Sequence, residues 1–262
     1  MNNPLILGMF IGGSFASGEA DQYSDLDLQL VVKDGAIEEL VPTLRALADK
    51  AGPLVAAFFA EHVGLPHMLI VLYEDLVHAD FEPVQISKVG SRNAGLSTHV
   101  LWERDQAVSA DLGVRYEKDR ETELTWIEDR IWTWSWYVQT KILRGELYEA
   151  LGGLQFIRDR VLFRLLAMHS DERASSARRA EARVGRWGER FAATVPSLGQ
   201  ESMMDALRSA IRLYVDLADP LQKKIGVQPA DQARAVVLDA LERGLTWSTQ
   251  KNRSTKKPSD GS

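Results

Sequence analysis

The spacing of apolar residues changes near residue 119, and this change limits the chain to two architectures in series. Before it, short apolar or alternating runs typical of strands stand at residues 5–12, 25–32, 54–59, 68–73, 76–84 and 99–102. Residues 37–50 interrupt these runs with apolar positions at helical spacing. After it, helical spacing recurs in stripes at residues 124–138, 150–168, 203–214 and 236–241. We therefore predict an α+β fold, in which a mixed β-sheet with helices precedes an α-helical bundle.

Breaks in the same pattern place the domain boundaries. We expect an N-terminal α/β domain over residues 1–110 and a helical bundle over residues 116–247. Apolar residues on two faces of residues 150–168 predict that this segment is the central helix of the bundle. Residues 248–262 are polar and partly basic, and we expect them to be disordered.

Composition narrows the classes of function. The chain has no cysteine, which excludes disulfides, iron–sulfur clusters and thiol catalysis and favours a reducing cytoplasm. Residues 1–105 hold 6 Lys and Arg against 15 Asp and Glu, a net charge of −9, whereas residues 106–262 hold 25 against 22, a net charge of +3. Because binding of a duplex rests on a basic surface, we expect no nucleic-acid partner. We also expect no export signal and no membrane span, since no run of about 20 apolar residues is present.

The segment that points to chemistry is residues 12–28, which read GGSFASGEADQYSDLDL. Gly12 and Gly13 let the backbone approach a ligand closely, because neither carries a Cβ. Ser14 supplies a hydroxyl and a backbone N–H where terminal phosphates can sit. Asp25 and Asp27 stand two residues apart on a predicted strand, so both carboxylates project from one face.

A third carboxylate is expected from a neighbouring strand. Asp80 is the first candidate, and Glu82, two residues further along the same strand face, is the second. Like charges repel and raise each other's pKa unless a cation lies between them, and hard oxygen ligands suit Mg²⁺ that bridges to phosphates. Three carboxylates and two Mg²⁺ ions would permit in-line attack on the α-phosphorus of a nucleoside triphosphate. The second ion, or Asp80 as a base, would activate the acceptor hydroxyl.

The joint pattern is more specific than its parts. A GGS alone is usually a turn, and a D-x-D alone is usually the solvated face of a strand. A P-loop is excluded because no G-K-[ST] follows the glycines, and a dinucleotide-binding Rossmann unit is excluded because G-x-G-x-x-G is absent. A strand, a GGS, a spacer and a D-x-D strand together indicate nucleotide chemistry.

This combination resembles the polymerase-β-type nucleotidyltransferases, whose hallmark is G-S, a spacer and then D-x-[DE]. More narrowly, residues 13–25 resemble the antibiotic-modifying branch, with the lincosamide nucleotidyltransferases first and the aminoglycoside nucleotidyltransferases close behind. Residues 143–151, LRGELYEAL, are similar to the helical domain of the lincosamide enzymes. The resemblance covers residue 5 to about residue 169, with weaker support to residue 244.

Carried over by motif, the resemblance implies that Gly13 and Ser14 bind the nucleotide phosphates, that Asp25 and Asp27 bind metal, and that Asp80 is a metal ligand or general base. It also implies ATP as co-substrate, an acceptor held between the two domains, and a homodimer, as in many members. Only about ten residues precede the glycines, where many members carry a helix. This departure predicts either that the nucleotide base is less enclosed than in those members or that the start of the sequence is truncated.

Three further residues are candidates for acceptor or phosphate contacts. Glu82 lies beside Asp80 on the predicted strand. Arg104 stands at the predicted domain junction, where a hinge salt bridge is an equally good explanation. Lys141 lies in the last turn of a predicted helix, where a cation is favourable for the helix dipole in any case.

Three functions follow from these features. The first is metal-dependent transfer of AMP from ATP to a hydroxyl of a lincosamide- or aminoglycoside-like molecule, with release of pyrophosphate, as in antibiotic resistance. The second keeps the chemistry but modifies a protein, as AMPylating antitoxins do, and the fused helical region argues against it. The third is a non-catalytic nucleotide-binding module, against which Ser14, Asp25 and Asp27 argue.

Overall fold

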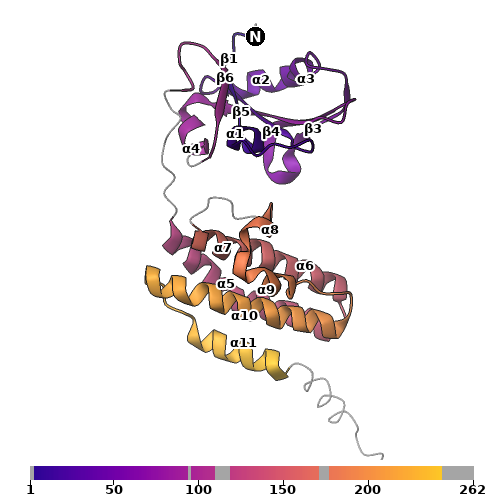
Figure 1. The fold of residues 1–262 in the computed structure, drawn as a ribbon, viewed down its shortest axis with the longest axis vertical. Helices are drawn as coiled ribbons and strands as arrows, with labels where there is room; N and C mark the ends of the chain where they lie inside the picture. The colour runs from indigo at the N-terminus through magenta and orange to yellow at the C-terminus, as the bar shows by residue number, and fades with distance from the viewer. Residues whose placement is uncertain (1–2, 94–95, 110–118, 171–176, 244–262) are drawn as a thin grey trace, which may run out of the picture. The chain divides into compact units, whose positions relative to one another are not determined.

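The computed structural model describes residues 3–93, 96–109, 119–170 and 177–243 (Figure 1). The chain divides into two compact units, Met1–Glu117 and Lys118–Ser262. The first combines a mixed sheet with short helices and the second is helical, which confirms the predicted α+β class. The predicted boundaries near residues 110 and 116 and the predicted tail at 248–262 lie outside the described residues.

A six-stranded sheet organises the N-terminal unit, with strand order β3-β4-β5-β2-β1-β6. Only the central pair β2 and β5 is parallel, and the other neighbours are antiparallel. The strands match the runs expected from the sequence and have the bounds β1 Ile6–Ile11, β2 Leu26–Val32, β3 Leu54–Ala60, β4 Leu65–Tyr73, β5 His78–Gln85 and β6 His99–Glu103.

Alternation along the strands gives the sheet two different faces. On one, which we call the core face, Leu30, Leu69 and Phe81 are buried with Leu40 and Leu44 of the overlying helices. These helices are α2 (Ile37–Leu40) and α3 (Leu44–Ala48), which lie near each other in Figure 1. The opposite face, which we call the acidic face, carries the side chains at positions 27, 80 and 82. Further along β2 and β5, the same face is covered by a smaller hydrophobic core that includes Phe10, Val31, Val84 and Val89.

The short helices differ from the expectation at residues 37–50, where one helix was predicted. A 3₁₀ turn, Val41–Thr43, separates α2 from α3. Pro42 explains the break, because proline has no N–H to donate and its ring clashes with the preceding turn. The other short helices of this unit are α1 (Gly13–Ser17) and α4 (Val89–Asn93), and 3₁₀ turns span Glu61–Val63 and Ile86–Lys88.

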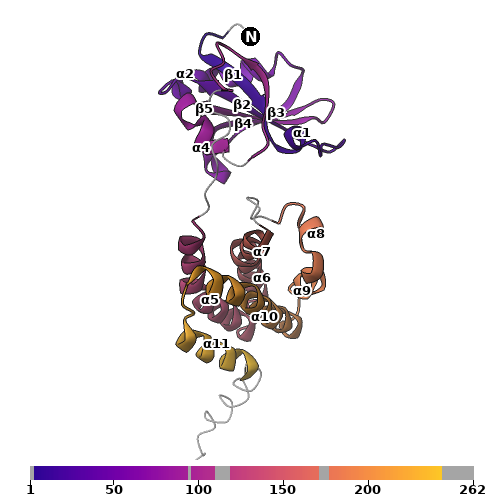
Figure 2. The ribbon, with the colours of Figure 1, turned by 60° about the vertical axis from the view of Figure 1, so that its left-hand side comes forward.

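The second unit is helical, and its longest helices run alongside one another (Figures 1 and 2). The bounds are α5 Arg120–Leu143, α6 Leu147–Ile157, α7 Phe163–Ser170, α8 Ala180–Arg183, α9 Gly188–Ala192, α10 Gln200–Ile225 and α11 Asp231–Arg243. A π-helical turn, Arg158–Leu162, joins α6 to α7, and a 3₁₀ turn, Gly185–Trp187, precedes α9.

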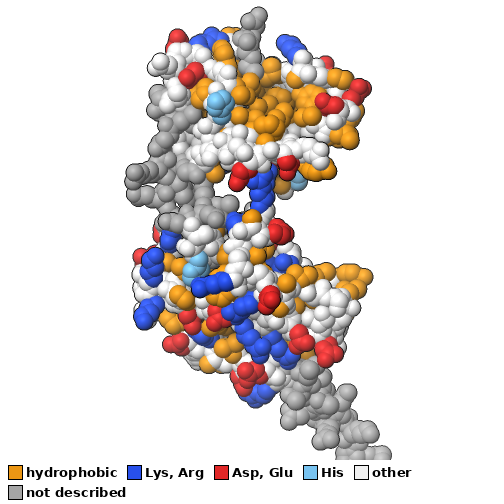
Figure 3. All heavy atoms as spheres, in the orientation of Figure 1, with side chains coloured by type: hydrophobic (Ala, Val, Ile, Leu, Met, Phe, Trp, Pro, Cys, Tyr) orange, Lys and Arg blue, Asp and Glu red, His pale blue; other side chains and the backbone are white. Residues whose placement is uncertain are grey.

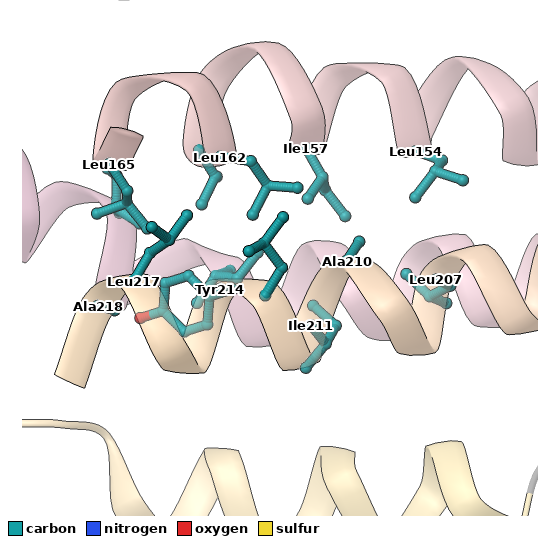
Figure 4. Close-up of a cluster of buried hydrophobic side chains, with 14 of the residues drawn as sticks. Leu154, Ile157, Leu162, Leu165, Leu207, Ala210, Ile211, Tyr214, Leu217 and Ala218 are labelled. Carbon is teal, nitrogen blue, oxygen red and sulfur yellow. The ribbon is translucent and has the colours of Figure 1, made fainter. Parts of the chain in front are cut away.

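The core of this unit lies between the α6–α7 segment and α10. Figure 4 shows Leu154, Ile157 and Leu162 facing Leu207 and Ala210. All five side chains are buried, so the apolar stripes of these segments pack against each other. Among the described residues, no helix combines the length and hydropathy needed to cross a bilayer.

Charge is distributed unevenly over the surface. On the face drawn in Figure 3, Lys and Arg side chains lie mostly on the helical unit, while hydrophobic side chains form a patch on the N-terminal unit. This view agrees with the net charge of −9 that residues 1–105 carry.

Candidate active site

The glycines after β1 bring the backbone against the first acidic strand. The N–H of Gly12 donates to the carbonyl of Asp27 at 2.8 Å, which fixes the loop to the start of β2. Gly13 has a φ of +58°, and a Cβ at this position would lie 1.9 Å from Oδ2 of Asp27. Only glycine permits both this conformation and this approach. The GGS segment and Asp27 therefore form one structural unit.

Ser14 follows in α1 and is almost completely buried, with 5% of its surface exposed. Within the part of the chain that the structure describes, its buried Oγ has no hydrogen-bond partner. Buried hydroxyls are normally satisfied, so an unpartnered one next to Gly13 in the sequence is a candidate to bind a ligand. Its backbone carbonyl accepts from the N–H of Glu19 at 2.9 Å, next to the left-handed Gly18 that ends the helix.

A tight turn carries the chain from α1 to the acidic strand. Asp21 Oδ1 accepts from the N–H of Tyr23 at 2.8 Å, and the N–H of Asp21 donates to Oγ of Ser24 at 2.9 Å. Such side-chain contacts to the local backbone are typical of Asp and Ser in turns. These hydrogen bonds hold Ser24, the residue directly before Asp25, in place.

The structure places Asp80 beside Asp27. The two residues are register partners in the parallel pair β2 and β5, so their side chains share the acidic face. Oδ1 of Asp80 is buried and accepts no hydrogen bond from a described residue, although Nε2 of His78 lies 3.4 Å away. Burial raises the pKa of the Asp80 carboxyl; His78 opposes this shift, and Asp25 and Glu82 add to it. The effect of Asp25 indicates that its carboxylate lies close enough to Asp80 to act on it electrostatically.

Glu82, the second candidate for the third carboxylate, is already paired. Its two oxygens accept from Nε and Nη2 of Arg92 on α4, at 3.0 and 3.3 Å. The neighbouring Gln29 and Asn93 exchange amide hydrogen bonds at 3.1 and 3.2 Å, which also hold α4 against the sheet. Glu82 thus anchors α4, and Asp80 is the better candidate for a ligand.

Two other predicted contact residues lie elsewhere. Arg104 follows β6, and its N–H donates to the carbonyl of Leu7 near the start of β1, at the end opposite to Ser14. The described contacts therefore do not bring Arg104 to the aspartates. Lys141 belongs to the helical unit, where Nζ lies 2.8 Å from Glu146 and 3.1 Å from Glu149.

The carboxylate oxygens of the aspartates suit a divalent cation, although they do not by themselves surround one. Within the described residues, no group of three or more His, Asp or Glu side chains is arranged to hold a metal ion. Asp25, Asp27 and Asp80 nevertheless offer hard oxygen ligands, and one buried oxygen of Asp80 accepts no hydrogen bond from a described residue. Mg²⁺ usually takes only one or two carboxylates and completes its shell with water and substrate phosphates. The residues present therefore fit Mg²⁺ that arrives with a nucleotide.

His78 and Arg92 belong to this region but were not singled out from the sequence. His78 stands two residues before Asp80, so strand alternation alone places both on one face. Arg92 had no signal in the sequence, because its role depends on how α4 packs against Glu82.

No protein-family model and no curated protein matches the sequence. Among solved structures, the chain is similar to an aminoglycoside 6-adenyltransferase from Bacillus subtilis, with 17% identity, 93% coverage of each chain and a TM-score of 0.46. It is also similar to a nucleotidyltransferase-like protein from Exiguobacterium sibiricum, with 11% identity, coverage of 84% of this chain and 75% of that chain, and a TM-score of 0.36. A third is a CD-NTase from Bradyrhizobium diazoefficiens in complex with GTP, with 14% identity, coverage of 92% and 88%, and a TM-score of 0.28. At these identities and TM-scores the likeness assigns no activity, which has to rest on the residues of the site.

Proposed function

We propose that the N-terminal unit binds a nucleoside triphosphate with Mg²⁺ and transfers its nucleoside monophosphate, AMP in the first instance, to a hydroxyl of a small molecule. The observation that carries this proposal is the close approach of Gly13 to Asp27, where a Cβ would lie 1.9 Å from Oδ2, together with the register pairing of Asp27 and Asp80. Ser14, the residue after Gly13, has a buried Oγ without a hydrogen-bond partner among the described residues. Oδ1 of Asp80 is also buried, and it lies 3.4 Å from Nε2 of His78.

Each residue has a distinct part in this proposal. The backbone at Gly13 and the hydroxyl of Ser14 bind the β- and γ-phosphates. Asp25 and Asp27 hold Mg²⁺, and Asp80 either completes the metal site or accepts a proton from the acceptor hydroxyl. When bound, Mg²⁺ would neutralise phosphate charge as the leaving group departs.

The reaction balances without a further reactant. The acceptor oxygen forms a bond to the α-phosphorus, and the bond from that phosphorus to the bridging oxygen of pyrophosphate breaks. The hydroxyl proton passes to a base, for which Asp80 is the candidate, because its raised pKa makes the carboxylate a better proton acceptor than an ordinary aspartate.

Pyrophosphate release is the direct test of this function. It is expected with Mg²⁺, one preferred nucleoside triphosphate and a hydroxyl acceptor, and it should fall to background when EDTA removes the metal. The acceptors to compare are lincosamides, aminoglycosides and buffer alone. Transfer of labelled nucleotide to a protein band in a lysate, with no small-molecule acceptor, would favour a protein substrate instead. Absence of Mg²⁺-dependent nucleotide binding would exclude the proposal.

Gly13→Ala is expected to weaken binding of Mg²⁺–ATP by about tenfold or more, because the new methyl group displaces the Asp27 carboxylate. Gly18→Ala is the matched control. Gly18 also has a positive φ, +75°, but a Cβ there meets nothing within 4 Å. Both variants should lose about 1–2 kcal/mol of unfolding free energy from the left-handed backbone. Calorimetric titration with Mg²⁺ and a non-hydrolysable ATP analogue separates them, and equal affinities would show that the contact with Asp27 is unimportant.

A further inference from the structure

An apolar surface continues the acidic face beyond Asp80. On β4, Ile70 and Leu72 are half-buried, whereas the alternate residues Leu69, Val71 and Tyr73 belong to the buried core face. On the edge strand β3, Phe58 is 51% exposed and Ala56 is also exposed. We call Ala56, Phe58, Ile70 and Leu72 the apolar shelf.

The shelf and the proposed site lie in one row across the sheet. Phe58 is the register partner of Ile70, Ile70 of Asp80, and Asp80 of Asp27. Gly12 bonds to Asp27 at the other end of this row. Neighbouring strands are about 4.8 Å apart, so Phe58 lies about 10 Å from Asp80 along the row. A drug-sized molecule with one group at Asp80 can therefore reach Phe58.

The direction of the reaction assigns a role to each end of the row. In an in-line displacement the attacking oxygen and the leaving pyrophosphate lie on opposite sides of the phosphorus. The proposed function places the pyrophosphate at Gly13 and Ser14, on the β1 side of the aspartates. The acceptor must then approach from the β4 side, over Ile70 and towards Phe58.

We infer that the apolar shelf binds the body of the acceptor, and that the acceptor is a hydroxyl compound with an apolar face rather than a polycation. This inference rests on the proposed function. A polycationic acceptor needs several carboxylates, and the four side chains of the shelf carry none. His62, whose ring centroid lies 5.8 Å from that of Phe58, adds an aromatic surface at the edge. Aromatic faces favour stacking against rings and apolar groups.

Binding can be measured independently of turnover. The probes are hexyl β-glucoside, a neutral amphiphile with hydroxyls, and neamine, a polycation. Each is titrated into the protein loaded with Mg²⁺ and a non-hydrolysable ATP analogue, and the Cδ1 methyl resonance of Ile70 is followed. Hexyl β-glucoside is expected to shift this resonance in the wild-type protein but not in Phe58→Asn, and neamine is expected to leave it unchanged. A shift by neamine alone, or a shift by the glucoside that survives in Phe58→Asn, would overturn the inference.

Turnover supplies the second readout, with whichever acceptor supports pyrophosphate release. Phe58→Asn is expected to raise the acceptor KM by about tenfold while kcat and the affinity for Mg²⁺–ATP are retained. Leu101→Asn is the control, because Leu101 is 46% exposed on β6 at the opposite edge of the sheet. An unchanged acceptor KM in Phe58→Asn would also overturn the inference that the apolar shelf binds the acceptor. Loss of Mg²⁺–ATP binding in the wild-type protein would instead count against the proposed function, and the same methyl titration of the nucleotide-free protein would still report on the shelf.

Discussion

Asp27→Asn is expected to reduce nucleotidyl transfer by about a thousandfold or more while leaving the fold intact. The substitution keeps the shape of the side chain but removes one negative charge from the group that Asp25, Asp27 and Asp80 form. Loss of one preorganised electrostatic contact commonly costs two to three orders of magnitude in rate. The backbone contact from Gly12 to the Asp27 carbonyl does not involve the side chain, so the strand should form normally.

The measurement is pyrophosphate release under saturating nucleotide, with circular dichroism to verify the fold. Asp49→Asn is the matched control, because Asp49 is an exposed carboxylate that follows α3 in the same unit. It should retain wild-type activity. Full activity in Asp27→Asn would show that Asp27 does not hold the metal.

Glu128→Ala is expected to destabilise the helical unit by about 3–5 kcal/mol, because it removes the acceptor of a buried polar network. Glu128 is 4% exposed on α5. Its carboxylate accepts from Nε1 of Trp132 at 2.9 Å, from Nε2 of Gln222 at 2.6 Å, from the N–H of Ala230 at 2.8 Å, and from the hydroxyl of Tyr214. Alanine would leave three buried side-chain donors and the half-buried N–H of Ala230 without this partner.

The network joins α5 to α10 and to the segment before α11. Burial, and next the hydrogen bond to Glu128, raise the pKa of the Tyr214 hydroxyl, so it remains a donor at neutral pH. Urea unfolding followed by tryptophan fluorescence measures the effect. Asp129→Ala is the control on the adjacent, exposed position and should change stability by less than about 1 kcal/mol. Equal effects of the two substitutions would show that the network contributes little.

The strands could be predicted from the sequence because one face of each is buried. The alternation of Asp25-Leu26-Asp27-Leu28 indicated a strand with Asp27 on one face, and β2 forms there, although it begins at Leu26 and leaves Asp25 just before the strand. α4 was not predicted, and its sequence explains why. Its five residues include Gly90 and Asn93, which are poor helix formers. The contacts of Arg92 with Glu82 and of Asn93 with Gln29 hold it in place, and such contacts between distant residues leave no local pattern.

In the candidate site, too, some residues could be predicted from their spacing in the sequence, whereas others depend on contacts in the folded protein. Gly13, Ser14, Asp25 and Asp27 lie within one short segment, so their spacing alone suggested a common role. The choice between Asp80 and the neighbouring Glu82 was different, because both occupy the same face of β5. It depends on Arg92, whose guanidinium pairs with Glu82, whereas Oδ1 of Asp80 is buried and accepts no hydrogen bond from a described residue. The roles of these residues in metal binding and catalysis stay predictions.

The central claim is that the aspartates bind a divalent cation together with a nucleotide. Mn²⁺ electron paramagnetic resonance measures this directly, because it reports the free ion and Mn²⁺ can replace Mg²⁺ at oxygen ligands. In the presence of a non-hydrolysable ATP analogue, the wild-type protein should bind Mn²⁺, and the double variant Asp25→Asn/Asp27→Asn should bind it at least about tenfold more weakly. Equal Mn²⁺ binding by the two proteins would contradict the account.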